Sequence, residues 1–209
     1  GSGESNARRY MIENDTVEAV IALPEKMFYN TGIGTFIWVL SNRKEEHRKG
    51  KIQLIDATGI KTPLRKNMGE KNCELSPAQR QEIVRIFMAF EESEVSRIFP
   101  NSEFGYWKVS VQQPLLDEQG NPVRDKKGRI QPDKSKSGTE IIPFNYEGGI
   151  EAFMDAEVRP YAPGAFVDPK GTKIGYELSF TKYFYKPVQL RPMEEIVADL
   201  KALEQETDG

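Results

Sequence analysis

The side chains that most often carry enzyme chemistry are scarce in this chain. Its 209 residues include one histidine, His47, and one cysteine, Cys73. His47 lies in the charged run 45–49, which is typical of a solvated surface, and Cys73 has no neighbouring histidine to activate its thiol. These counts exclude multi-histidine and cysteine-rich metal sites, so we predict no metal site. Counting alone therefore excludes most metal and nucleophile chemistry.

A loop with two large aromatic side chains is the most informative candidate for a binding site. Residues 24–34 separate two apolar runs and contain Phe28 and Tyr29 among polar neighbours. The loop is longer than a usual hairpin connection, and long loops are often functional. One interpretation is a stacking platform for a planar ligand such as a base. The alternative is that Phe28 folds back onto the edge of the sheet.

The elements that would hold this loop are strand-like. Residues 17–23 and 35–41 are nearly continuous apolar runs, which are typical of strands buried on both faces of an α/β sheet. Residues 51–57 form a third such run, and residues 5–14 favour a short helix. Gly32 and Gly34 open a strand rather than a helix, so they do not indicate a dinucleotide-binding turn.

The second half of the chain mixes helices and strands. Ser76 and Gln79 predict a capping box at the start of a helix. Further helices are expected over 147–158 and 192–206, and strands over 104–111 and 174–180. The aromatic cluster Tyr176, Phe180, Tyr183, Phe184 and Tyr185 favours packing over base stacking. Residues 59–72 form a stretch rich in Gly, Lys and Asn, and residues 117–138 a polar hairpin or flexible insert.

The global composition narrows the class of protein. Twenty-nine basic and 32 acidic residues give a net charge of −3, so the chain as a whole is not an electrostatic nucleic-acid binder. No apolar run is long enough to cross a bilayer, and the start is not a signal peptide, so we expect no membrane association and a cytoplasmic location. Because the chain lacks an initiator methionine, we expect a processed or tagged product or a piece of a longer protein.

Several segments resemble the modification (M) subunit of type I restriction-modification systems. The resemblance lies in residues 17–33 and their continuation 36–42, in 51–57, and late in the chain in 173–177 and 180–186. The head of the chain, residues 1–6 with Arg8 and Arg9, also fits the lead-in to the first of these strands. The resemblance covers most of the chain except residues 117–138.

This resemblance implies an S-adenosylmethionine-dependent adenine-N6 DNA methyltransferase. Such enzymes carry a glycine-rich cofactor motif and an Asn-Pro-Pro-Phe-type tetrapeptide, and neither is found in this sequence. The tetrapeptide is excluded because all 13 prolines are isolated. The implied fold is α/β to α+β, the C-terminal part of a Rossmann-like sheet followed by an accessory region with a terminal helix. Residues 1–60 would end the catalytic domain and residues 61–209 would form the accessory and assembly region. No catalytic residue is expected in this chain, and S-adenosylmethionine is expected to bind the intact parent only.

The resemblance also implies roles for individual residues. Phe28 would stack on the flipped adenine, with Tyr29 as the fallback, and Asn30, Thr31 and Gly32 would support the loop. The terminal helix, through Ile196, Leu200 and Leu203, would dock on a partner. The implied partners are the specificity subunit, the restriction subunit and, in the assembled complex, DNA. Two alternatives are a non-enzymatic assembly module and a free-standing fold unrelated to methylation.

Overall fold

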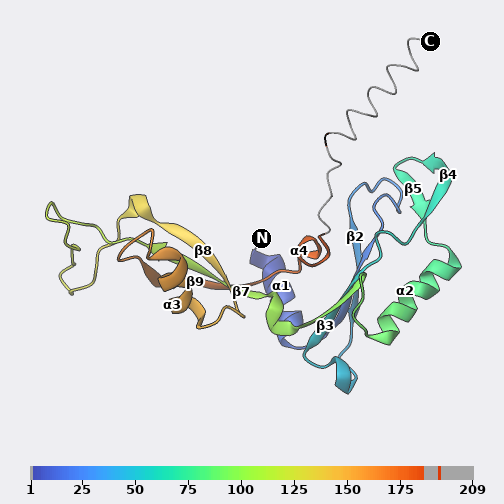
Figure 1. Cartoon of the computed structure of the whole chain (residues 1–209), viewed down its shortest axis with the longest axis horizontal. Helices are drawn as coiled ribbons and strands as arrows, with labels where there is room; N and C mark the ends of the chain where they lie inside the picture. The colour runs from blue at the N-terminus through green and yellow to red at the C-terminus, as the bar shows by residue number, and fades with distance from the viewer. Residues whose placement is uncertain (1, 186–192, 194–209) are drawn as a thin grey trace, which may run out of the picture.

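The computed structural model describes residues 2–185 and Met193. Its sheets contain four, two and three strands, and two lobes lie side by side along the long axis with α1 and α4 between them (Figure 1). The elements are α1 Ser2–Glu13, β1 Val17–Leu23, β2 Thr35–Leu40, β3 Lys51–Asp56, β4 Thr62–Met68, β5 Lys71–Glu74, α2 Pro77–Ala89, β6 Ser96–Pro100, β7 Gly105–Gln112, β8 Gly138–Pro143, α3 Gly149–Phe153, β9 Phe166–Tyr176 and α4 Phe180–Phe184. The chain therefore has the mixed α and β composition that its sequence predicted.

A four-stranded sheet with the order β2-β1-β3-β6 organises the first lobe. β1 pairs antiparallel with β2 and parallel with β3, and β3 pairs antiparallel with β6. The predicted hairpin of the first two apolar runs is confirmed, with Leu23 opposite Thr35 at the loop end. The loop 24–34 therefore leaves and re-enters the sheet at neighbouring strand ends.

Both faces of this sheet are covered, because its central strands carry apolar side chains in both directions. Val20 and Leu54 are paired neighbours and pack, with Ile12 of α1, in the cluster that also receives side chains of α4. On the opposite face, Ile55 packs in a second cluster with Ile83 of α2. Burial of apolar area on both faces is the main force that holds α1, α4 and α2 against the sheet.

β2 differs from the expectation that it would be buried on both faces. Phe36, Ile37 and Leu40 are 49%, 45% and 53% exposed. The physical reason is its position at the sheet edge, where no described strand pairs with its outer side. β2 also lacks the charged residues and prolines that often protect an edge strand.

Helix α2 begins where its capping signal predicted. The Ser76 side chain accepts a hydrogen bond from Gln79 N at 3.2 Å, and the Gln79 side chain accepts one from Ser76 N at 2.9 Å. Pro77 follows in the first turn, and Phe90 in left-handed geometry ends the helix. The reciprocal cap fixes the end of α2 that lies closest to the loop 24–34.

One side chain of the charged run 45–49 is not solvated as predicted. Arg48 is 4% exposed, and its guanidinium lies 4.3 Å and 4.4 Å from the ring centroids of Phe87 and Phe90. It donates hydrogen bonds to the Phe87 carbonyl and to Gln53. The guanidinium is buried because these rings and acceptors replace the water that it loses.

A half-buried carboxylate, that of Asp15, ties the turn after α1 to the sheet. Asp15 accepts hydrogen bonds from Lys44 Nζ at 2.6 Å, Gly50 N at 2.9 Å and Asn101 Nδ2 at 2.8 Å. Burial raises the pKa of Asp15, but the hydrogen bonds, that of Lys44 first, outweigh it and hold the pKa below the ordinary value of 3.8. The ionised form is therefore the one that the fold stabilises.

This lowered pKa predicts an acid-dependent stability. Asp15 stabilises the fold fully above its unfolded pKa, and this contribution disappears as the pH falls through the folded pKa. We expect Asp15→Asn to lower stability at neutral pH and to flatten the loss of stability below about pH 4. Urea unfolding at a series of pH values measures both effects. Glu45→Gln, the same chemical change on an exposed side chain, is the matched control, and equal pH profiles for the two variants would refute the role given to Asp15.

Candidate functional site

The loop 24–34 lies against the β4–β5 hairpin at one end of the first lobe (Figure 1). Asn72 N donates a hydrogen bond to the carbonyl of Lys26 at 3.0 Å, and Cys73 Sγ donates to the carbonyl of Glu25 at 3.3 Å. β5 therefore holds the first half of the loop through its backbone. Cys73, which the sequence indicated to be a bystander thiol, is 2% exposed and contacts the loop through this hydrogen bond.

Two non-glycine residues give this loop its shape. Lys26 has φ 56° and Asn30 has φ 52°, so both lie in the left-handed region. Asparagine adopts this region more readily than other side chains, whereas lysine rarely does, and such backbone persists where its surroundings hold it. Lys26 and Asn30 flank Phe28 and Tyr29, so the two turns delimit the segment that carries the aromatic rings.

The three large side chains of the loop point to different surroundings. Met27 packs against the apolar cluster below α2, whereas Phe28 and Tyr29 are 46% and 59% exposed. The alternative that Phe28 folds back onto the sheet therefore describes Met27 better than Phe28. Within residues 2–185, no aromatic ring contacts Phe28 closely enough to count as a ring pair.

Tyr29, in contrast, is held by the hairpin. Its hydroxyl donates to Met68 Sδ at 3.8 Å, and Lys71 Nζ lies 5.3 Å from the centroid of its ring. Such a cation–π contact is worth about 0.5–1 kcal/mol at an exposed site. Tyr29 is thus held against the hairpin, whereas the half-exposed ring of Phe28 has no aromatic partner among the described residues.

A cavity of about 310 Å³ opens beside these rings. It combines apolar and aromatic surface with two cationic groups and one carboxylate. Its lining residues are Met27, Phe28, Tyr29, Lys71, Glu74, Leu75 and Arg80. This arrangement suits a planar ring that stacks on its faces and presents polar groups at its edge.

The residues predicted to support the loop lie in three different settings. Thr31 Oγ1 donates to the Tyr29 carbonyl at 3.2 Å, which stiffens the loop locally. Asn30 Oδ1 lies beside Gly69, and Gly32 lies beside the Glu70 carboxylate. The structure therefore brings Asn30 and Gly32 against the hairpin turn, and Thr31 against the loop itself.

The β4–β5 hairpin, which completes this site, was not predicted from the sequence. Residues 59–72 looked like a polar connection, yet they contain β4 and the first half of β5, and they bring Lys71 to the cavity. A usable signal was present, because Gly69 and Glu70 form a two-residue turn with glycine, at φ 64°, in its first position. The contribution of Arg80 could not be predicted from the sequence, because only the packing of the capped end of α2 brings this side chain to the cavity.

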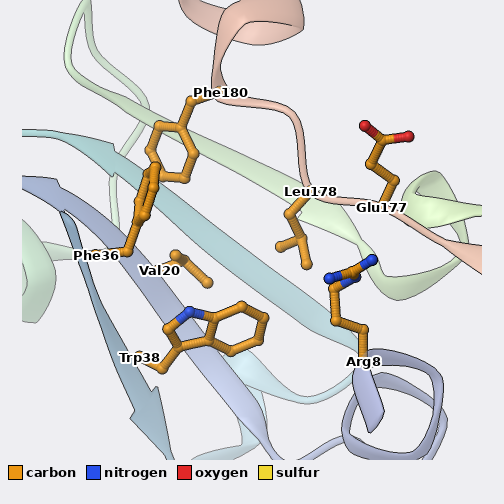
Figure 2. A pocket seen from close by; sticks show the side chains of 7 residues that line it. All are labelled: Arg8, Val20, Phe36, Trp38, Glu177, Leu178 and Phe180. Atoms are coloured by element: carbon orange, nitrogen blue, oxygen red, sulfur yellow. The ribbon is translucent and has the colours of Figure 1, made fainter. Parts of the chain in front are cut away.

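A second cavity, of about 300 Å³, lies beside β2 on the face covered by α1 and α4 (Figure 2). Phe36 and Phe180 face each other with their ring centroids 5.1 Å apart, and Trp38 lies beside them. Arg8 Nε donates to the Tyr176 carbonyl at 2.9 Å. The cavity is aromatic on the side formed by β2, and it leaves part of Phe36 exposed.

The late aromatic cluster packs as predicted, but not on one strand. β9 ends at Tyr176, and the residues from Phe180 to Phe184 form the short helix α4, so the expected strand over 174–180 is too long. Ser179 causes the change, because its side chain accepts the Lys182 N–H and caps a helix. Tyr185 remains 69% exposed, whereas the other rings of the cluster pack on the first lobe.

The remaining candidates form no site in the part of the chain that the structure describes. His47 is an exposed side chain near Glu45, with Nδ1 and Oε2 3.5 Å apart. No group of three or more His, Cys, Asp or Glu side chains is placed to hold a metal ion among the described residues. Nor does any described helix have the length and apolarity to span a membrane. The predicted docking residues Ile196, Leu200 and Leu203 lie outside the described residues.

Comparison with known proteins gives consistent matches. The chain is 35% identical over 94 residues to the type I restriction enzyme MjaVIII methylase subunit of Methanocaldococcus jannaschii, covering 44% of this chain and 16% of that protein. It is 31% identical over 111 residues to the MjaIX methylase subunit of the same organism, covering 53% and 19%. A crystal structure of a type I restriction-modification methyltransferase subunit from Streptococcus thermophilus matches with TM-score 0.41 and 21% identity, covering 49% of this chain and 20% of that chain.

The chain thus spans less than a fifth of the length of these two curated relatives. A sequence profile described as N-6 DNA methylase matches residues 1–110. This range is more than half of the chain, and it contains the whole four-stranded sheet, the loop 24–34 and the β4–β5 hairpin. The chain therefore belongs to the N-6 DNA methylase family, as its resemblance to type I modification subunits predicted.

Proposed function

We propose that this chain is the C-terminal part of a type I modification subunit that methylates adenine N6 in DNA, and that its loop 24–34 stacks on the flipped adenine. The observation that carries the proposal is the free ring of Phe28 at the edge of a cavity in a chain of this family. Phe28 is half exposed, and a ligand that covers its ring removes that apolar area from water. A base removed from the duplex offers a π-face of the right kind.

In this proposal the loop stacks on the base, and the hairpin holds the side chain that positions it. Extruding a base costs a few kcal/mol, and one stacking contact returns about 1–3 kcal/mol. Phe28 supplies that contact, while Tyr29, fixed by Met68 and Lys71, limits the positions that the base can take. Arg80 and Lys71 give the cavity cationic groups that suit an adjacent phosphate.

The cofactor belongs to another part of the proposed enzyme. S-adenosylmethionine, when bound, supplies the methyl group. Among the described residues, no strand leads through a glycine-rich turn into a helix, so this chain does not fit that cofactor. The proposal places the cofactor motif and the catalytic tetrapeptide upstream, and the described residues position the base only.

The exposed β2 strand supports the domain organisation that we propose. Residues 1–60 would end a Rossmann-like catalytic domain, whose remaining strands would add to the outer edge of β2. Phe36 and Ile37 point to opposite faces of β2, and both are half exposed, as expected for a strand that is interior in a larger sheet. Residues 61–209 would then form the accessory region.

The proposed partners are the specificity subunit, the restriction subunit and DNA. In this proposal the residues Ile196, Leu200 and Leu203 dock on the specificity subunit, because their sequence spacing is that of one apolar face of a helix. Sequence reading would belong to that partner, which agrees with the net charge of −3 of this chain.

A methyl-transfer assay tests the proposed function. The complete subunit, assembled with its specificity subunit, is incubated with labelled S-adenosylmethionine and DNA, and the digested nucleosides are separated. The expected result is label in N6-methyladenine. Label in cytosine, or no label with assembly intact, would reject the proposal, and the second result would favour the non-enzymatic assembly module. In a parallel titration, the 209-residue chain alone should not bind the cofactor.

A further inference from the structure

A hollow larger than the two cavities described above lies away from the aromatic loop. It is a groove of about 800 Å³ between α1 and the sheet formed by β7, β8 and β9. Four of its lining residues are cationic and none is acidic. The lining residues are Ser5, Asn6, Arg8, Arg9, Tyr106, Lys108, Thr172, Lys173, Ile174 and Gly175.

Two lysines of this groove face each other across neighbouring strands. Lys108 of β7 and Lys173 of β9 are direct partners in the antiparallel register, and both are exposed. Like charges placed directly opposite each other destabilise a sheet. On the other side of β7, Lys108 pairs with Ile141, which offers no charge to compensate. The arrangement is unfavourable for folding alone, and an anion between the two ammonium groups would relieve it.

The other charges around the groove do not neutralise these lysines. No ion pair within residues 2–185 engages Arg8, Lys108 or Lys173, whereas Arg9 pairs with Glu13 at 2.9 Å. Arg8 uses its Nε for the Tyr176 carbonyl. Asp168, farther along β9, accepts the backbone N–H of Lys170. Three cations thus remain available for a ligand.

The shape of the groove floor supports an extended ligand. A side chain at Gly175 would collide with the Tyr106 ring, because an added Cβ atom would lie 2.3 Å from that ring. The Tyr106 ring therefore lies across Gly175, where only a residue without a side chain leaves room for it. Hydroxyl and amide groups of Ser5, Asn6 and Thr172 line the same hollow.

We infer that this groove binds the phosphate backbone of DNA, at a place distinct from the cavity for the target base. Cationic side chains mixed with neutral hydroxyl and amide groups are the usual set that contacts phosphates. DNA is favoured over an acidic protein segment because this chain belongs to a DNA methylase family. The inference rests on the proposed function only in its choice of DNA as the anion. The net charge of −3 is a sum over the whole chain, so it does not show that four cationic residues gather at this groove.

The test measures how DNA affinity depends on salt. The complete subunit, assembled with its specificity subunit, is titrated with a labelled random duplex between about 50 and 200 mM salt. Replacing both lysines, Lys108→Gln with Lys173→Gln, should weaken binding to every sequence. It should also reduce the slope of log affinity against log salt by about 1.8, since each phosphate contact contributes about 0.9. Lys108→Arg with Lys173→Arg should keep the wild-type slope.

The matched control is Lys126→Gln with Lys127→Gln, the same loss of charge on exposed residues of the polar segment 117–138. This pair should leave the slope unchanged. An equal loss of slope in both pairs, or none in the groove pair, would overturn the inference. Weakened assembly with an unchanged DNA slope would also overturn it and identify an acidic protein segment as the occupant.

Two further readouts separate the possible failures. Because Lys108 and Lys173 repel each other, the groove variant should unfold at the same or a higher urea concentration than wild type, so a lost slope cannot come from misfolding. Phe28→Ala should leave the salt slope of random DNA unchanged. A groove variant with a reduced slope, together with full methylation by Phe28→Ala, would sustain the groove and reject the stacking role.

Discussion

Replacing Phe28 with alanine should lower methylation by the complete subunit about 5- to 150-fold. One stacking contact on a flipped base is worth about 1–3 kcal/mol, and alanine removes it entirely. The loss should appear in turnover or in affinity for the target site, and not in stability, because the Phe28 side chain is 46% exposed and lies outside the apolar clusters. Steady-state methylation of a duplex with one target site measures it.

Phe28→Trp is the matched variant, because it keeps a π-face at the same position. It should retain most of the activity, whereas Tyr29→Phe should have a smaller effect than Phe28→Ala. Tyr29→Phe loses only the contact of the hydroxyl with Met68 and keeps the ring beside Lys71. Unchanged kinetics of Phe28→Ala would contradict the stacking role, and a large loss confined to Tyr29→Ala would transfer that role to Tyr29.

The second large effect concerns the edge of β2. Ile37 is 45% exposed in this chain, but in the proposed full sheet it becomes an interior side chain. We expect Ile37→Lys to be tolerated by the 209-residue chain, with a change within about 1 kcal/mol. In the complete subunit the same change should cost about 3–5 kcal/mol or prevent folding, because it leaves an unpaired charge inside a packed sheet.

Urea unfolding of both proteins, without partner subunits, measures this difference. Val84→Lys is the control, since Val84 is 58% exposed on α2 and the proposed sheet does not cover it. It should be tolerated in both proteins. If Ile37→Lys were equally mild in the complete subunit, no strand would add to β2, and the proposed division at residue 60 would be wrong.

Local sequence patterns were sufficient to predict several helices and strands and to identify the loop 24–34 as a candidate site. β1 was predicted with its observed bounds because its apolar run is nearly continuous, and α2 because Ser76 and Gln79 form a reciprocal cap. The loop 24–34 followed from its length and its two rings. These features depend on neighbours in the chain, so they could be recognised without tertiary information.

Features that depend on distant contacts were missed or misjudged. The exposure of β2 follows from its place at the sheet edge, which its apolar sequence does not reveal. Arg48 is buried because Phe87 and Phe90, far along the chain, enclose its guanidinium. The basic groove exists because the register of β7 and β9 brings Lys108 opposite Lys173. In each case the sequence pattern involves neighbouring residues, whereas the contact that decides the structure joins residues far apart in the sequence.

The most direct test of the stacking loop uses DNA in which 2-aminopurine replaces the target adenine. The fluorescence of this base rises when it leaves the duplex stack and is quenched when it stacks on an aromatic ring. With the wild-type complex, the rise should therefore be small, and with Phe28→Ala it should be clearly larger, while Phe28→Trp should again quench it. Equal fluorescence for the wild-type and Phe28→Ala complexes, at saturating binding of both, would contradict the claim that this loop receives the flipped adenine.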